Sequence, residues 1–155
     1  MTTHTYESHL LWEGTTGPGY RGYSRSHRAV APPSTVEVPL SADPQFLGDP
    51  ARINPEQMLV MAASSCQLLA FLALAAMRGI DVRGYQDEAV GTMAQTDGAP
   101  MHITTITLSP HIVVAADTVI SQVEKLVHEA HESCYIANSL RGSVVVQPTV
   151  TVEAS

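Results

Sequence analysis

Two cysteines are the only thiols in this chain of 155 residues, and their surroundings bear on what they could do. Cys66 stands in NPEQMLVMAASSCQLLAFLALAAMRG, the most apolar stretch of the sequence, and Cys134 stands in HEAHESCYIANSLRG. A thiol reacts as its thiolate, and apolar surroundings disfavour that charged form. A reactive Cys66 therefore requires a cation close by, and without one the residue would be an inert part of the core.

The cations that could serve Cys66 are few. They are Arg21, Arg25, Arg28, Arg52, Arg78, Arg83 and Arg141. An arginine brought into an apolar site needs a carboxylate to hold it, and Glu56, at the beginning of the same segment, is the natural counter-ion. These residue types point to a small polar group made of an arginine, Glu56 and Cys66.

Cys134 could complete a redox pair. If the Cys66 thiolate attacks a peroxide it becomes a sulfenic acid, which a second thiol captures as a disulfide when the two Cα atoms come within about 7 Å. The sequence alone does not show that approach. The residues alone therefore leave two alternatives open: two inert core cysteines, or a catalytic pair.

The segment that carries Cys66 is expected to be a long helix. Asn54 is a favourable N-cap, Pro55 suits the first helical position, and Glu56 is placed where the helix dipole favours a negative charge. Gly79 after Arg78 is typical of a helix end. Over residues 55–78 such a helix would measure about 36 Å, against a radius of gyration of about 15 Å for a compact domain of this size.

This helix would be apolar on every side, so it must be enclosed. A membrane span is disfavoured because Ser64, Ser65 and Gln67 stand at its middle and its flanks lack basic or aromatic anchors. A monomer with one long core helix is the simpler alternative. We expect instead a homodimer in which two such helices pack together through small residues. The positions that permit close approach are Ala62, Ala63, Ala70 and Ala73.

The rest of the chain predicts short strands and one further helix, and so an α+β fold in a single domain over 1–155. Strands are expected within 9–14, 15–24, 29–40, 84–94 and 101–116, the last two around a turn at 95–100, with one final strand over 143–153. Pro110 suggests an edge strand or a bulge. Asp117 is expected to cap the second helix, which has apolar residues at three- and four-residue spacing. These are Val119, Val123, Leu126, Val127 and Ala130.

Composition argues against several classes of function. The net charge is −7 and the eight lysines and arginines are scattered, so nucleic acid is not an expected partner. The N-terminal stretch has no basic start followed by an apolar run, so no secretory signal is expected and the cytoplasm is the expected location. His128 and His131 lack the HExxH spacing, and two cysteines without a CxxC motif cannot enclose zinc, so no metal site is expected.

Two stretches carry a family resemblance: NPEQMLVMAASSC, in which Glu56 stands ten residues before Cys66, and the later AHESCYIANSL. Together they resemble the OsmC/Ohr superfamily of osmotically inducible and organic hydroperoxide resistance proteins. LLWEG, YSRSH and SADPQFLGDPARINPEQ extend the resemblance over nearly the whole chain. The resemblance implies an OsmC-like fold, with antiparallel sheets around long buried central helices in an intertwined homodimer with active sites at the subunit interface. It also implies thiol-based reduction of organic (alkyl or lipid) hydroperoxides without flavin, haem or metal.

The same resemblance suggests roles for particular residues. Cys66 matches the peroxidatic cysteine, Cys134 the resolving cysteine, and Glu56 the glutamate that orients an active-site arginine. Arg25, in YSRSH, is the best match for that arginine, and Arg28 is the second choice. By analogy, a lipoyl-type dithiol would re-reduce the pair.

Two departures from the family pattern bear on the chemistry. Tyr135 follows the second cysteine where many members have proline, and Gln67 follows the first where an aromatic residue is usual. These changes concern the resolving step and the substrate. The alternative function is a dimeric protein on the same fold that binds an apolar small molecule and whose cysteines do no turnover.

Overall fold

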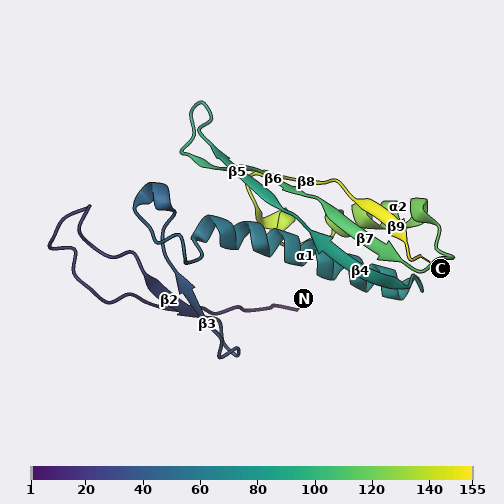
Figure 1. The fold of residues 1–155 in the computed structure, drawn as a ribbon, viewed down its shortest axis with the longest axis horizontal. Helices are drawn as coiled ribbons and strands as arrows, with labels where there is room; N and C mark the ends of the chain where they lie inside the picture. Colours follow the sequence, from purple (N-terminus) through teal and green to yellow (C-terminus); the bar gives the residue numbers. More distant parts are fainter. Residues whose placement is uncertain (1, 155) are drawn as a thin grey trace. The chain divides into compact units, whose positions relative to one another are not determined.

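A computed structural model describes residues 2–154 and consists of two compact units, one up to Met58 and one from Leu59 (Figure 1). Each unit has its own sheet structure, and the helix that carries Cys66 begins in the first unit and continues through the second. The expectation of a single domain over 1–155 stays a prediction.

The first unit is built on a three-stranded antiparallel sheet. Its strands are β1 (His9–Leu11), β2 (His27–Val30) and β3 (Glu37–Leu40), in that order across the sheet. The strand expected within 15–24 does not form, because the glycines there make successive tight turns. Gly19 N–H donates to the Thr16 carbonyl at 2.9 Å, and Gly22 N–H donates to the Gly19 carbonyl at 3.0 Å.

The long helix forms where the sequence predicts it, as α1 (Pro55–Met77). Its start is fixed by a reciprocal cap, in which Asn54 Oδ1 accepts the Gln57 N–H at 2.8 Å and Gln57 Oε1 accepts the Asn54 N–H at 3.0 Å. Its end is fixed by Gly79, whose φ of 68° lies in the left-handed region that glycine adopts without strain. The capping residues named from the sequence are therefore confirmed.

The second unit contains two mixed sheets (Figure 1). One has the order β4 (Val82–Asp87), β7 (Pro110–Val114), β9 (Thr149–Val152), and the other β5 (Val90–Ala94), β6 (His102–Leu108), β8 (Ser143–Val146). The expected antiparallel pairing holds for β4 with β7 and for β5 with β6. β8 and β9 add to these pairs in parallel.

Three local expectations in this unit are wrong. The single final strand is two strands in different sheets, separated by Gln147 and Pro148. Pro110 does not mark an edge, since β7 is the middle strand of its sheet; the proline is tolerated there as the first strand residue. Asp117 does not cap the second helix, because α2 (Ile120–Glu132) begins later, with Val119 at the N-cap and no side-chain cap.

The core of the second unit lies where α1 and α2 meet the strands. Of the apolar positions expected on α2, all but Val119 are fully buried. α1 buries a single stripe in its own chain, made of Ala63, Gln67, Phe71 and Ala75. The side of the helix away from that stripe stays open, with Leu69 63% exposed. One chain therefore encloses the apolar helix along one side only.

By length and composition alone, α1 is also long and apolar enough to cross a membrane. A core helix of a folded protein passes the same test, and 22% of the most apolar window of α1 is buried inside the protein. The buried Gln67 in that window has a protein hydrogen-bond partner. This side of α1 is thus packed as protein core.

Candidate active site

The two cysteines lie together in the second unit. Cys66 is at the middle of α1 and partly exposed, whereas Cys134 follows the end of α2 and is 2% exposed. Burial raises the pKa of the Cys134 thiol, and a side-chain hydrogen bond with Cys66 raises it further. The thiols are therefore adjacent, with the protonated form of Cys134 favoured and Cys66 the more accessible of the two.

The chain turns sharply after α2, and this turn positions Cys134. Asn138 Nδ2 donates to the carbonyls of Glu132 and Cys134, at 3.0 and 2.9 Å, so Asn138 caps the end of α2 and stabilises the turn. The Ala137 N–H approaches the Cys134 sulfur at 3.5 Å. This contact lowers the pKa of Cys134, but burial and the Cys66 hydrogen bond outweigh it.

Two polar contacts join α1 and the residue after it to α2, one next to Cys66 and one at the far end of α1. Gln67 Nε2 donates to the Val127 carbonyl at 3.0 Å, while Gln67 Oε1 is buried with no partner in residues 2–154. Further along, the Arg78 guanidinium makes a two-pronged ion pair with Glu129. This pair raises the pKa of Arg78 and lowers that of Glu129. The contacts fix how the two helices are placed, and so where the cysteines meet.

Arg25 is held rigidly in the first unit. Its Nη1 and Nη2 donate to the carbonyls of Tyr23 and Tyr20, at 2.9 and 2.6 Å. Its guanidinium also lies over the rings of both tyrosines, 4.1 Å from the Tyr23 centroid and 4.8 Å from the Tyr20 centroid. Trp12 packs edge-on against Tyr23 and donates its indole N–H to the Ser24 carbonyl at 2.8 Å.

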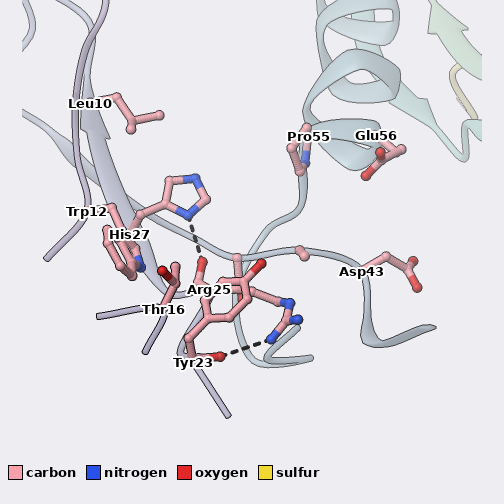
Figure 2. Close-up of a pocket in the computed structure, with 11 residues that line it drawn as sticks. Leu10, Trp12, Thr16, Tyr23, Arg25, His27, Asp43, Pro55 and Glu56 are labelled. Atoms are coloured by element: carbon pink, nitrogen blue, oxygen red, sulfur yellow. Dashed lines mark hydrogen bonds between the residues drawn. The ribbon is translucent and has the colours of Figure 1, made fainter. Parts of the chain in front are cut away.

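Arg25 and Glu56 line the same cavity of about 440 Å³ (Figure 2). The other residues of its wall are Leu10, Trp12, Thr16, Tyr23, His27, Ser41, Ala42, Asp43 and Pro55. Within residues 2–154 no ion pair joins Glu56 to Arg25, whose guanidinium is instead bonded to backbone carbonyls. The expected carboxylate and arginine thus share a cavity without direct pairing.

Arg28, the second choice for the active-site arginine, lies in a different setting. It pairs with Glu37 at 3.3 Å and Glu13 at 3.9 Å, on an exposed part of the three-stranded sheet. It does not line the cavity that contains Glu56. Between the two candidates, the cavity therefore favours Arg25.

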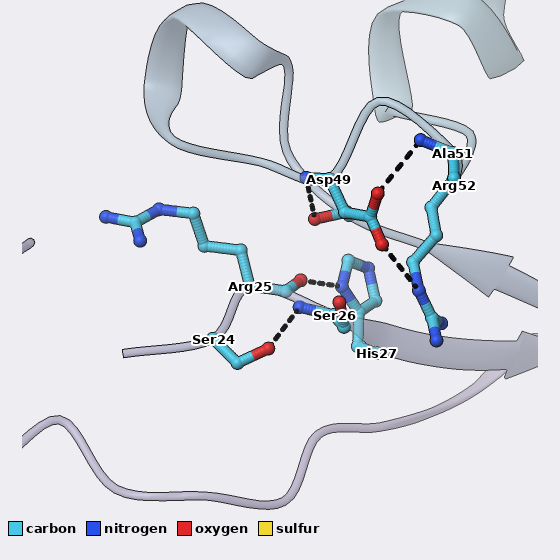
Figure 3. A network of polar contacts seen from close by, with 8 residues as sticks. Ser24, Arg25, Ser26, His27, Asp49, Ala51 and Arg52 are labelled. Carbon is cyan, nitrogen blue, oxygen red and sulfur yellow. Dashed lines mark hydrogen bonds and ion pairs between the residues drawn. The ribbon is translucent and has the colours of Figure 1, made fainter. Parts of the chain in front are cut away.

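The loop that leads into α1 is tied to the sheet by a polar network (Figure 3). The Asp49 N–H donates to Ser41 Oγ at 3.0 Å, and Asp49 Oδ1 accepts the Ala51 N–H at 2.9 Å. Arg52 adds an ion pair to Asp49 at 3.5 Å. His27 faces the carbonyl of Arg25 through Nδ1 at 2.8 Å. These bonds fix the backbone on both sides of the cavity.

Some residues that build the site were not expected from the sequence. Tyr20, Tyr23 and Trp12, which form the aromatic setting of Arg25, and Gln67, which anchors α1 to α2, were among them. The tyrosines precede Arg25 by five and two residues, and this close spacing of aromatic and cationic residues is the signal that could have indicated a stacked guanidinium.

Ser64 on α1 takes part in helix packing, and the histidines His128 and His131 belong to no metal site in the described residues. The Ser64 hydroxyl donates to the Asp87 carboxylate, which joins α1 to β4 and agrees with a role in helix packing. The structure places no group of three or more His, Cys, Asp or Glu suited to a metal ion within residues 2–154.

A long central helix, two mixed sheets and two adjacent thiols, one of them buried, together define an OsmC-like protein. The family model described as OsmC-like protein matches residues 48–149. The chain belongs to this family, and the superfamily predicted from its sequence motifs is confirmed.

Individual proteins show how far the likeness extends. An OsmC-like protein of unknown function from Vibrio cholerae is 30% identical, with a TM-score of 0.86 over 95% of this chain and 100% of that one. The uncharacterized protein YmaD of Bacillus subtilis is 25% identical over 123 residues, 77% of this chain and 79% of YmaD. An organic hydroperoxide resistance protein OsmC from Legionella pneumophila is 18% identical, with a TM-score of 0.68 over 98% of this chain and 100% of that one; this likeness shows the fold.

Proposed function

We propose that this protein is a thiol-dependent peroxidase that reduces organic hydroperoxides through Cys66 and Cys134. The observation that carries the proposal is the proximity of the two thiols, because Cys66 lies close enough to Cys134 to raise the pKa of that thiol and is the more accessible of the two. Family membership supports it, because a solved structure with the same fold is named for organic hydroperoxide resistance.

In the first step the Cys66 thiolate attacks the terminal oxygen of the hydroperoxide. The O–O bond breaks, Cys66 becomes a sulfenic acid, and the alkoxide leaves and takes up a proton to give the alcohol. The sulfur is oxidised by two electrons and the peroxide is reduced by two. Burial and the nearby Cys66 raise the pKa of Cys134, which favours the protonated form of Cys134 beside the attacking sulfur.

In the second step Cys134 resolves the sulfenic acid. Its sulfur attacks the Cys66 sulfur, a disulfide forms, and the hydroxyl leaves as water with the Cys134 proton. A dithiol reductant, of the lipoyl type by analogy, then exchanges with this disulfide and releases both thiols as it becomes a disulfide itself. The cycle needs no metal or organic cofactor.

Arg25 and Glu56 have a supporting role in this proposal. A guanidinium next to the reacting sulfur stabilises the thiolate and the charge that develops on the departing oxygen, most strongly where water is excluded. Two carbonyls and two tyrosine rings already fix the guanidinium of Arg25, so it would need little reorganisation. Glu56 adds a carboxylate to the same cavity. That Arg25 and Glu56 act on the thiol pair in the active protein is itself part of the proposal.

The active form is proposed to be a homodimer in the cytoplasm. α1 is apolar on all sides, yet its own chain covers only one stripe. The uncovered side presents Met61, Ser65, Leu69, Leu72 and Ala76 at three- and four-residue spacing. Of the small residues expected at the helix contact, Ala63 is instead buried in the core of its own chain, whereas Ala73 is exposed. A second copy of α1 carries a matching apolar stripe, and packing the two removes both from water. The apolar side chains would also favour a hydroperoxide with an alkyl or lipid tail.

The decisive experiment counts thiols. One equivalent of cumene hydroperoxide should consume two thiols per chain and give an intramolecular Cys66–Cys134 disulfide, detected by mass spectrometry. Unchanged thiols would favour the alternative, a dimeric protein that binds an apolar small molecule and performs no turnover. Hydrogen peroxide serves as the comparison, and equal or faster oxidation by it would contradict the preference for an apolar tail.

A further inference from the structure

A small cavity of about 130 Å³ in the second unit contains a cation without a carboxylate partner. It is lined by Leu59, His102, Ile103, Ile106, Leu140, Arg141 and Gly142. Arg78 pairs with Glu129, and Arg83 pairs with Asp81 and Glu153. Arg141 makes no ion pair within the described part of the chain, residues 2–154.

The backbone, and not an ion pair, fixes the place of Arg141. A Cβ added at Gly142 would lie 2.3 Å from the Ile103 carbonyl oxygen, so only glycine allows this close approach to β6. β8 begins at the next residue, Ser143, and pairs with β6. On its other side, Arg141 follows the short helix η2 (Ala137–Ser139) and Leu140. The backbone that carries Arg141 is therefore fixed at the wall of the cavity, while the residue itself is exposed.

The rest of the wall indicates what the cation could bind. His102 lines the cavity, and its Nδ1 lies 2.9 Å from the Pro100 carbonyl oxygen, which orients the ring. The remaining side chains are aliphatic, from Leu59, Ile103, Ile106 and Leu140. A cationic end within an aliphatic wall suits a carboxylate on a hydrocarbon chain better than a free inorganic anion.

This cavity lies on the thiol side of α1. Leu59 and Cys66 are seven residues apart, which puts them on the same side of the helix about 10 Å apart along its axis. Both residues belong to the second unit. A ligand anchored at Arg141 could therefore extend its chain along α1 toward the cysteines.

We propose that Arg141, assisted by His102, forms a subsite for the carboxylate of a ligand with an apolar chain. Binding of the carboxylate at this subsite does not depend on the proposed function. Only the identification of the ligand as a hydroperoxide rests on it. The subsite would then hold the acid end of the substrate while Cys66 reacts with the peroxide. Arg141 is a specificity residue in this scheme and takes no part in the reaction at sulfur.

The binding test uses saturated ligands and needs no turnover. Decanoate and decanol are titrated calorimetrically into the wild type, Arg141→Gln and Arg141→Lys. The dissociation constant for decanoate should rise about fivefold in Arg141→Gln and much less in Arg141→Lys, while that for decanol is unchanged. Arg83→Gln removes an equal charge elsewhere on the unit and should change neither. Equal losses in Arg141→Gln and Arg83→Gln, or equal wild-type affinity for decanoate, decanol and inorganic phosphate, would overturn the subsite.

The turnover test uses linoleic acid hydroperoxide and its methyl ester. Arg141→Gln should raise KM about fivefold for the acid, leave KM for the ester unchanged, and leave kcat unchanged for both. If the wild type reduced neither compound, the proposed peroxidase would fail, and the decanoate titration would still judge the subsite. If the acid and the ester were reduced with the same KM, and Arg141→Gln changed neither value, the subsite would be overturned while the peroxidase activity would be confirmed.

Discussion

The thiol of Cys134 lies close enough to that of Cys66 for Cys66 to raise its pKa, although Cys134 follows α2 and Cys66 lies within α1. The contact is asymmetric, because Cys134 is buried and Cys66 is partly exposed. In the proposed cycle a peroxide therefore reacts with Cys66 first, and Cys134 then captures the product. This asymmetry assigns each cysteine its part in the proposed cycle.

Single replacements of the cysteines should have different effects. Cys134→Ser should react once with cumene hydroperoxide and accumulate a Cys66 sulfenic acid, because no thiol is left to resolve it. Dimedone trapping and mass spectrometry would detect this product. Cys66→Ser should lose no thiol on the same timescale. Rapid oxidation of Cys134 in Cys66→Ser would reverse the two roles.

The pKa of Cys134 should fall when its hydrogen bond to Cys66 is removed. Burial keeps the pKa above the ordinary thiol value in Cys66→Ala, but the second contribution is lost. Thiolate absorbance in the ultraviolet, followed against pH, measures the change. An unchanged titration in Cys66→Ala would show that the two thiols do not interact.

The raised pKa of Cys134 also predicts that the folded protein is less stable at alkaline pH. An unfolded thiol ionises near pH 8.5, so the unfolded chain releases its proton before folded Cys134 does. The contribution of Cys134 to the free energy of unfolding is complete below that pH, and it is lost as the pH rises through the pKa of Cys134 in the folded protein. Urea unfolding over a pH series should show this decline, and Cys134→Ala should decline less.

Arg25 and Arg28 make a matched pair of variants. Arg25→Ala should slow oxidation of Cys66 by about a hundredfold, the usual loss when one electrostatic contact to the developing charge is removed. Arg28→Ala should leave the rate unchanged, because Arg28 pairs with Glu13 and Glu37 on an exposed surface. Stopped-flow oxidation measures both. Equal rates in the two variants would remove Arg25 from the mechanism.

The uncovered side of α1 can be tested with a charge. Leu69→Glu should convert the proposed dimer to a monomer, because it would bury a carboxylate in the apolar contact proposed between the two α1 helices. Sedimentation velocity distinguishes the two states. Met101→Glu, at another exposed apolar residue outside α1, is the control and should remain dimeric. A dimer that tolerates Leu69→Glu would place the interface elsewhere.

Gln67 offers a stability test of the contact between the helices. Gln67→Ala should cost about 2–4 kcal/mol of unfolding free energy, since it opens a cavity and removes the bond to the Val127 carbonyl. Gln67→Met fills the space and removes the buried Oε1, which lacks a partner, so it should cost about 1 kcal/mol or less. Urea unfolding of the variants gives both values. Equal losses would show that the hydrogen bond matters more than the volume.

The sequence alone determined the local features of α1 and the family. Asn54, Pro55 and Gly79 act through neighbouring backbone, so their capping roles can be predicted without tertiary structure. The motifs around Cys66 and Cys134 were specific enough to indicate an OsmC-like fold, which the family match confirms.

Only the tertiary structure decided how distant segments combine. Residues 143–153 alternate like one strand, but their division between two sheets depends on which strands they meet, β6 and β7. The proximity of the two thiols likewise depends on how α2 and its following turn pack on α1, with contacts from Gln67 and Arg78. Arg25 stacks on two tyrosines and bonds to backbone carbonyls, which no pattern of residue types had specified. Pairing and burial are set by contacts between residues far apart in the chain, and the physical chemistry of a local stretch does not fix those contacts.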